Sequence, residues 1–174
     1  MKNIVLIGFM GTGKSTVGRL LAQRMGSKFV DTDKEIEEIT GLTAAQLINK
    51  HGIIRFRSEE SLVVKKLAEQ TGLVIATGGG TLLDPENRRL LAINGVFIHL
   101  LASVDAIYQR VKGKKKDRPL LAKGDLKEQI TKLLKERQDL YQEADFTIDT
   151  DQTSLEKVVE EICSKLEVRG SKFE

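Results

Sequence analysis

A glycine-rich stretch near the N-terminus carries the residues with the clearest chemistry. It matches the pattern G-x-x-x-x-G-K-[ST] and lies between a short apolar run and a helical stretch. Glycines let backbone N–H groups turn inward around phosphate oxygens, and a following helix adds its positive dipole end. Lys14 suits the β- and γ-phosphates of a nucleotide, and the Ser15 hydroxyl suits Mg²⁺. The sequence therefore predicts a site for ATP and Mg²⁺ built from Gly8, Gly11, Thr12, Gly13, Lys14, Ser15 and Thr16.

This phosphate-binding loop does not by itself distinguish a kinase from a GTPase or a motor ATPase. The sequence holds no Asn-Lys-x-Asp motif of the kind that reads guanine, and no strand of four apolar residues that ends in Asp-Glu. The residues that would bind a phosphoryl acceptor must therefore indicate the reaction.

Two carboxylates, Asp31 and Asp33, follow the second apolar run. Ligands of parallel sheets bind at the carboxyl ends of the strands, beside a phosphate-binding loop. One carboxylate can join the Mg²⁺ shell while the other orients or deprotonates an acceptor hydroxyl. The alternative is that Asp33 only caps a helix expected over residues 34–39.

An arginine–glutamate pair and a glycine triplet are the next candidate site residues. Arg57 and Glu60 are spaced i, i+3, so Glu60 can hold Arg57 as a rigid receptor for a carboxylate, unless the two form a solvated surface pair. Gly78, Gly79 and Gly80 follow the third apolar run. They permit close approach of the backbone to a ligand, unless they form only a flexible turn.

A basic run over residues 112–121 has three interpretations. It can contact nucleic acid, it can be a mobile lid whose Arg118 reaches the phosphates, or it can serve solubility alone. No aromatic residue interleaves with its lysines, which argues against a base-stacking surface. Arg137, on a late helical stretch, is a second candidate anion clamp.

The elements that position these residues alternate between strands and helices. The apolar runs are continuous, as in strands buried on both faces of a parallel sheet, and the alternation predicts an α/β domain with right-handed crossovers. The regions 41–57 and 112–124 fit the alternation least and are candidate insertions that close over a ligand. Strands are predicted at 4–7, 29–30, 73–76, 96–101 and 146–148, and helices at 14–25, 34–39, 59–70, 85–92, 104–111, 126–143 and 154–166.

Composition narrows the class of protein. The 174 residues fit one domain, and a net charge of +3 from 28 basic and 25 acidic residues is too balanced to indicate nucleic acid. No run of consecutive apolar residues approaches the length that a membrane-spanning helix requires. The single cysteine, Cys163, excludes an intramolecular disulfide and favours a reducing compartment. We expect a cytoplasmic monomer with small-molecule substrates and neither nucleic acid nor membrane as partner.

Six motifs taken together, in order from Gly8 to Tyr141, resemble the shikimate kinase family. They are the phosphate-binding loop, Asp-x-Asp at 31–33, Phe-Arg-x-x-Glu at 56–60, Gly-Gly-Gly at 78–80, Arg-Pro-Leu-Leu at 118–121 and Glu-Arg-x-x-x-Tyr at 136–141. The resemblance implies the three-layer P-loop kinase fold related to nucleoside monophosphate kinases, with a five-stranded parallel sheet flanked by helices. It also implies one domain over residues 1–174, with a shikimate-binding region at about 33–60 and a mobile lid at about 112–124.

The resemblance further implies a reaction and a set of roles. The expected reaction is ATP-dependent phosphorylation of the 3-hydroxyl of shikimate. Catalytic roles fall on Lys14, Asp33 and Arg118, and the Mg²⁺ would be held by Ser15 with Asp31 in its outer shell. Shikimate would be bound by Asp33, Arg57, Arg137 and the glycines at 78–80, with Glu60 orienting Arg57, and ATP by the phosphate-binding loop with Arg110 and Arg118.

The chain departs from the family pattern at two places. Ile53 stands where the family usually has glutamate, and residues 151–154 lack the proline that the family often carries in its adenine-binding loop. Arg110 remains able to stack on the base. Two alternatives stay open: a gluconate-type sugar-acid kinase, which is not expected to combine Phe-Arg-x-x-Glu with Glu-Arg-x-x-x-Tyr, and a catalytically inactive nucleotide-binding regulator, which usually loses a residue of the Lys14, Ser15, Asp33 and Arg118 type.

Overall fold

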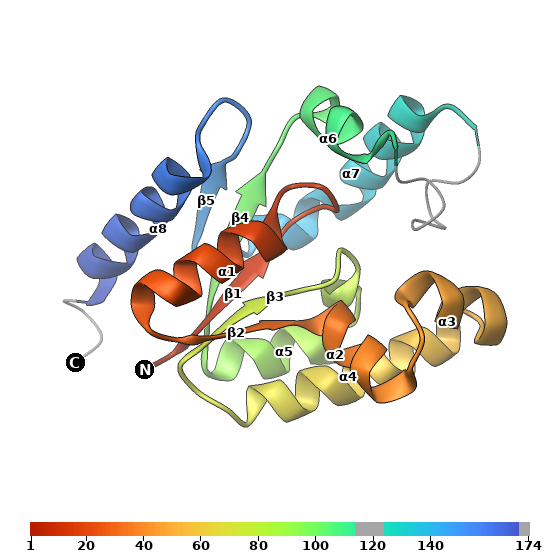
Figure 1. Cartoon of the computed structure of the whole chain (residues 1–174), viewed down its shortest axis with the longest axis horizontal. Helices are drawn as coiled ribbons and strands as arrows, with labels where there is room; N and C mark the ends of the chain where they lie inside the picture. The colour runs from red at the N-terminus through yellow and green to blue at the C-terminus, as the bar shows by residue number, and fades with distance from the viewer. Residues whose placement is uncertain (114–123, 171–174) are drawn as a thin grey trace.

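A five-stranded parallel sheet with helices on both faces forms the centre of the molecule (Figure 1). The computed structural model describes residues 1–113 and 124–170. The strand order is β2-β3-β1-β4-β5, all neighbours being parallel. The predicted α/β class and five-stranded sheet are thereby confirmed. The strands are β1 (Asn3–Ile7), β2 (Lys28–Asp31), β3 (Leu73–Ala76), β4 (Gly95–Leu101) and β5 (Phe146–Asp149).

The central strand β1 is buried along its whole length. Val5 lies opposite Ile75 of β3 on one side and Phe97 of β4 on the other. Alternate residues of a strand face opposite sides of a sheet, so Val5 and Ile7 enter one apolar cluster while Ile4 and Leu6 enter another. This two-sided burial explains why the strand is apolar without alternation.

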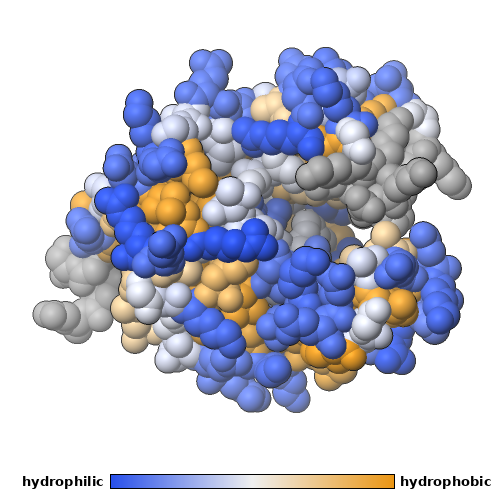
Figure 2. Space-filling view, viewed as in Figure 1, coloured by the Kyte–Doolittle hydropathy of each residue, from blue (hydrophilic) through white to orange (hydrophobic). Residues whose placement is uncertain are grey.

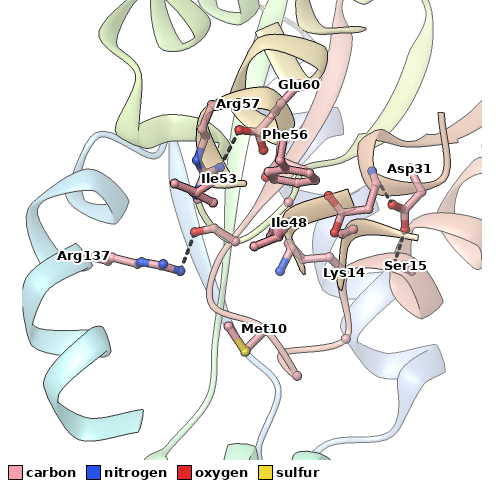
Figure 3. A pocket seen from close by; sticks show the side chains of 18 of the residues that line it. Met10, Lys14, Ser15, Asp31, Ile48, Ile53, Phe56, Arg57, Glu60 and Arg137 are labelled. Atoms are coloured by element: carbon pink, nitrogen blue, oxygen red, sulfur yellow. Dashed lines mark hydrogen bonds and ion pairs between the residues drawn. The ribbon is translucent and has the colours of Figure 1, made fainter. Parts of the chain in front are cut away.

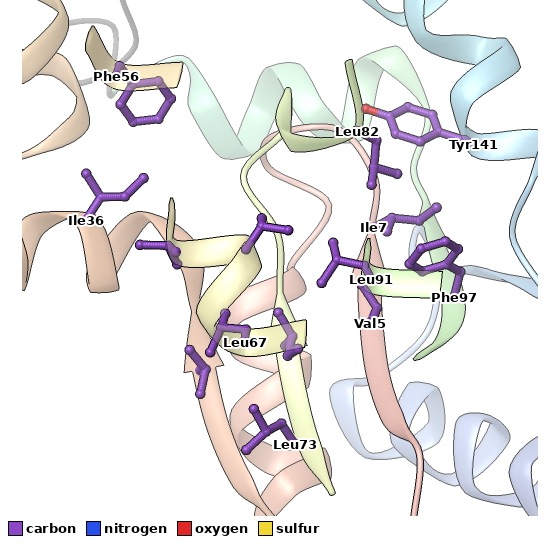
Figure 4. Close-up of a cluster of buried hydrophobic side chains, with 14 of the residues drawn as sticks. Val5, Ile7, Ile36, Phe56, Leu67, Leu73, Leu82, Leu91, Phe97 and Tyr141 are labelled. Carbon is purple, nitrogen blue, oxygen red and sulfur yellow. The ribbon is translucent and has the colours of Figure 1, made fainter. Parts of the chain in front are cut away.

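Each face of the sheet is covered by its own helices. α1 (Lys14–Met25) and α8 (Leu155–Gly170) pack together on the face of Ile4 and Leu6. α4 (Ile53–Ala68) and α5 (Pro85–Ile93) cover the other face, where Phe56, Leu67 and Leu91 join the cluster drawn in Figure 4. α6 (Val104–Val111) and α7 (Leu126–Gln142) pack on each other over a third cluster.

The region 41–57 folds into helices of its own, so the predicted helix start at residue 59 is wrong. α2 (Thr32–Thr40) is followed by α3 (Ala44–His51), which begins with a capping box between Thr43 and Gln46. Gly52, at φ +86°, separates α3 from α4, which starts at Ile53. Arg57 therefore lies in the first turns of α4, at the end that faces α3.

The visible face in Figure 2 is mainly hydrophilic and is hollowed between the side of α3 and the side of α6 and α7. No helix in the described parts of the chain combines the length and the apolar character that a membrane crossing requires. Most of the predicted lid, including Arg118, falls at 114–123 and lies outside the described residues.

Candidate active site

A pocket of about 600 Å³ opens at the carboxyl ends of β1, β2 and β3 (Figure 3). It is lined by residues of the phosphate-binding loop, by Asp31 and Asp33, by the pair of Arg57 and Glu60, and by the glycine triplet at 78–80. Among the described residues that were predicted to bind ATP, Gly8 and Thr12 do not line it. The predicted residues that do are Gly11, Gly13, Lys14, Ser15, Thr16, Asp31, Asp33, Arg57, Glu60, Gly78, Gly79, Gly80, Arg110 and Arg137.

The phosphate-binding loop has the backbone that anion binding requires. Gly8, Gly11 and Gly13 all have positive φ, a backbone conformation that residues other than glycine rarely adopt. α1 begins at Lys14 without a side-chain cap, so its first N–H groups are available to an anion. Lys14 Nζ donates to the carbonyl oxygens of Gly8 at 2.8 Å and Phe9 at 2.9 Å. The ammonium group is thus held within the loop.

Thr12 stabilises the phosphate-binding loop through a hydrogen bond within the loop. Its Oγ1 donates to the Phe9 carbonyl oxygen at 2.8 Å, and the residue is buried. Thr12 therefore shapes the loop and is not among the residues that line the pocket.

Ser15 and Asp31 join the loop to the end of β2. Ser15 Oγ donates to Asp31 Oδ2 at 2.5 Å, while Asp31 Oδ1 accepts from the backbone N–H of Asp33 at 3.1 Å. The N-cap of α2 is therefore Asp31, and the alternative that Asp33 caps this helix is wrong. A hydroxyl and a carboxylate side by side are oxygen ligands of the type that Mg²⁺ prefers, and Mg²⁺ commonly uses only one or two protein groups beside phosphates and waters. The donor set fits that ion.

Asp33 faces the pocket with an unsatisfied oxygen. Its Oδ1 is buried and has no hydrogen-bond partner among the described residues. Burial, followed by the negative charges of Asp31 and Glu60, raises the pKa of Asp33 to about 6, against the opposing effect of Lys14 and Arg57. A buried acceptor without a donor is unfavourable, and the residue also lines the pocket, where a ligand hydroxyl can donate to its carboxylate.

Arg57 is held by a carboxylate that has almost no solvent exposure. Arg57 Nη1 contacts Glu60 Oε2 at 2.5 Å, and Glu60 is 1 % exposed. The other oxygen of Glu60 accepts from Thr81 Oγ1 at 2.6 Å. The alternative of a solvated surface pair is wrong, because the carboxylate lies in the protein interior. Sequence reasoning missed Thr81, since a threonine after a glycine triplet gives no signal of such a contact.

Arg137 reaches the same glycine loop from α7. Its Nη1 donates to the Gly79 carbonyl oxygen at 2.9 Å, and its guanidinium carbon lies 5.7 Å from the centre of the Phe9 ring. Arg137 is buried, although it lines the pocket. The two arginines thus come from α4 and α7 to adjacent glycines.

Each glycine of the triplet leaves room for one functional side chain. A Cβ at Gly78 would lie 2.7 Å from Asp33 Oδ1, one at Gly79 would lie 3.3 Å from Arg137 Nη1, and one at Gly80 would lie 2.3 Å from Arg57 Nη2. None of the three has positive φ. Gly78 and Gly80 are therefore required for the close approach of these side chains, whereas a Cβ at Gly79 would need only a small shift. The alternative of a merely flexible turn is wrong.

Apolar side chains form a wall of the pocket that sequence reasoning did not single out. Met10, Ile48, Ile53 and Phe56 line it together (Figure 3). Ile53, at the position where the family usually has glutamate, is the first residue of α4 and is 43 % exposed. Apolar residues in helical patterns usually indicate core packing, so their place in the pocket emerged only from the fold.

Arg110 joins the phosphate-binding loop to the segment after β5. It donates to the Gly11 carbonyl oxygen at 3.1 Å and to the Thr150 carbonyl oxygen at 2.8 Å. The Asp151 carboxylate accepts from the Ser103 N–H at 3.0 Å, which fixes this segment at the start of α6. Hydrogen bonds thus hold the segment that lacks the family's usual proline.

Comparison with known proteins gives a consistent result. The family model described as "Shikimate kinase" matches residues 10–167. A shikimate kinase of Pelotomaculum thermopropionicum is 58 % identical over 93 % of this chain and 94 % of its own length. A shikimate kinase of Acinetobacter baumannii, solved in complex with shikimate, is 38 % identical with a TM-score of 0.92 over 97 % of this chain and 94 % of that one.

More distant structures share the fold alone. A gluconokinase from Sinorhizobium meliloti is 18 % identical with a TM-score of 0.59, over 99 % of this chain and 95 % of that one. The family match over most of the chain, together with relatives well above 30 % identity, decides the assignment. The chain belongs to the shikimate kinase family.

Proposed function

We propose that the protein transfers the γ-phosphoryl group of ATP to the 3-hydroxyl of shikimate. The observation that carries the proposal is the joining of a phosphate-binding loop, a carboxylate with an unsatisfied oxygen and two buried or half-buried arginines in one pocket. This is the set of groups that a kinase for a small hydroxylated carboxylic acid requires.

The nucleotide occupies the side of the pocket formed by the phosphate-binding loop. Lys14 leaves the loop carbonyls to bind the β- and γ-phosphates, and the N–H groups at the start of α1, which has no side-chain cap, bind the phosphate oxygens. Ser15 and Asp31 would hold Mg²⁺, which neutralises phosphate charge when bound. Arg118 lies outside the described residues, and its contact with the phosphates stays a prediction from the sequence.

The acceptor occupies the side formed by α2, α4 and α7. Arg57 and Arg137 bind the carboxylate of shikimate through charge-assisted hydrogen bonds. Asp33 accepts from a ring hydroxyl and, with its raised pKa, takes up the proton as the hydroxyl attacks. The apolar wall that includes Ile48 and Phe56 packs against the ring carbons.

Phosphoryl transfer needs little beyond these groups, because it depends mainly on positioning of the reactants and on stabilisation of charge. The contacts of Arg57 with Glu60 and of Arg137 with Gly79 hold the two arginines in place, and the arginines position the acceptor. We further propose that the enzyme is a cytoplasmic monomer without nucleic-acid or membrane partners. Sedimentation of the pure protein would test the monomeric state.

A coupled assay of ADP release tests the proposal. With ATP and Mg²⁺, shikimate should support turnover, whereas gluconate or no acceptor should give only background. Equal turnover with gluconate would favour the sugar-acid kinase, and ATP binding without turnover on either acceptor would favour the inactive regulator. Omission of Mg²⁺ should abolish turnover.

A further inference from the structure

We infer that Thr81 is a positioning residue that sets the affinity for the substrate carboxylate through Glu60 and Arg57. The inference rests on the proposed function, in which Arg57 binds that carboxylate. Thr81 does not line the pocket, so any effect on the substrate must pass through another residue.

The contacts form a continuous buried chain that ends in the pocket. Thr81 Oγ1 donates to Glu60 Oε1 at 2.6 Å, and Glu60 Oε2 accepts from Arg57 Nη1 at 2.5 Å. Thr81 has no exposed surface and Glu60 is 1 % exposed, whereas the Arg57 side chain is 29 % exposed. The hydroxyl thus fixes one carboxylate oxygen while the other oxygen orients the guanidinium.

The backbone on both sides of Thr81 is fixed as well. Its N–H donates to the Gly78 carbonyl oxygen at 3.2 Å, and its carbonyl oxygen accepts from Asn87 Nδ2 of α5 at 3.1 Å. A Cβ at Gly78 would lie 3.1 Å from both Glu60 Oε1 and Thr81 Oγ1. The absence of a side chain at Gly78 leaves the space in which the hydroxyl meets the carboxylate.

A carboxylate this buried depends on each of its donors. If the hydroxyl is removed, Glu60 Oε1 loses a donor in a place that water does not readily reach, and the carboxylate must turn to find another. The partner that can follow such a turn is the Arg57 fork, because it is the end of the chain nearest to solvent. The bidentate recognition of a carboxylate requires that the fork keep its orientation.

The test compares Thr81→Val, which has the same shape without the hydroxyl, with Thr81→Ser, which keeps the hydroxyl. In Thr81→Val the Kd for shikimate should rise at least about fivefold, as expected for an unsatisfied buried acceptor. The KM for ATP should stay within about twofold of the wild-type value, since the phosphate-binding loop is unaffected. Thr81→Ser should restore most of the shikimate affinity. Thr131→Val, which removes an exposed threonine hydroxyl from α7, is the matched control and should leave both constants unchanged.

A double variant separates this inference from the proposed function. In an Arg57→Ala background, Thr81→Val should cause no further loss of shikimate affinity, because the effect of Thr81 passes through Arg57. An unchanged Kd in Thr81→Val, or an additive loss in the double variant, would overturn the role of Thr81 while Arg57→Ala still shows its own defect. If Thr81→Val does not fold, failure of the folded Thr81→Ser to keep near-wild-type affinity would also overturn it. Normal shikimate binding by Arg57→Ala would instead contradict the proposed function itself.

Discussion

Gly80 and Arg57 lie so close that a Cβ at position 80 would be 2.3 Å from Arg57 Nη2 and 2.9 Å from the guanidinium carbon. Gly80→Ala should therefore displace the guanidinium and weaken shikimate binding by about tenfold or more, since a charge-assisted contact is lost. Gly79→Ala is a graded comparison, because its Cβ would lie 3.3 Å from Arg137 Nη1 and needs only a small shift. Calorimetric titration with shikimate should rank Gly80→Ala as the more damaged variant. The reverse order would show that the contact between Gly79 and Arg137, and not that between Gly80 and Arg57, limits binding.

The pair of Ser15 and Asp31 predicts a dependence on Mg²⁺. Asp31→Asn keeps an N-cap for α2 but removes a negative charge beside Ser15. The Mg²⁺ concentration for half-maximal rate should rise about tenfold, while the melting temperature changes little. Asp84→Asn alters the N-cap of α5 outside the pocket and should leave the Mg²⁺ dependence unchanged. A wild-type Mg²⁺ curve for Asp31→Asn would exclude Asp31 from the metal site.

Asp33 should make the protein less stable at neutral pH than it would otherwise be. Its pKa rises on folding from 3.8 to about 6, chiefly through burial. The folded state therefore binds more protons than the unfolded state between these values, and the free energy of unfolding falls as pH rises through that window. At about 1.4 kcal/mol per pH unit, the effect amounts to at most about 3 kcal/mol above pH 6.

Asp33→Asn should accordingly raise the melting temperature at pH 8, raise it less at pH 4.5, and abolish turnover. Thermal unfolding of both proteins at the two pH values measures this difference. In the wild type, kcat/KM for shikimate should increase with pH through about 6 as Asp33 becomes ionised. An equal change in melting temperature at both pH values would contradict the raised pKa of Asp33.

Lys14→Ala should separate chemistry from acceptor binding. The loss of the ammonium group removes charge stabilisation at the phosphates and should lower kcat by on the order of 10²-fold or more. Shikimate binding in the absence of nucleotide should stay near wild type, because the arginines lie elsewhere in the pocket. Lys28→Ala, an exposed lysine at the start of β2, is the control for loss of positive charge. Wild-type turnover by Lys14→Ala would refute its role.

Arg57 should not tolerate replacement by another cation. Arg57→Lys keeps the charge but loses the planar fork, and the Kd for shikimate should rise about tenfold or more. Arg89 forms a pair of the same i, i+3 spacing with Glu86, but on the exposed surface of α5. Arg89→Lys should leave shikimate binding unchanged, since exposed pairs of this kind contribute little. Equal tolerance at both positions, measured by calorimetry, would assign the carboxylate to other residues.

The sequence by itself determined the phosphate-binding loop and the order of strands and helices. The glycines and Lys14 act through backbone conformation and contacts within a few residues, so a local pattern is sufficient to identify them. The continuous apolar runs predicted buried parallel strands for the same reason, because burial on both faces leaves a mark on each residue of the run.

The tertiary structure excluded one of the two interpretations that the sequence left open for Asp33 and for the pair of Arg57 and Glu60. Sequence spacing left Asp33 as a possible cap, and only the end of β2 at Asp31 and the start of α2 at Thr32 assign the cap to Asp31. The link between Thr81 and Glu60 spans a separation of 21 residues, and it exists because η1 (Thr81–Leu83) packs against α4. The glycine triplet likewise takes its meaning from Asp33, Arg137 and Arg57, which three different helices bring to it. Contacts between distant segments depend on how the elements pack, and a local pattern of residue types does not encode that packing.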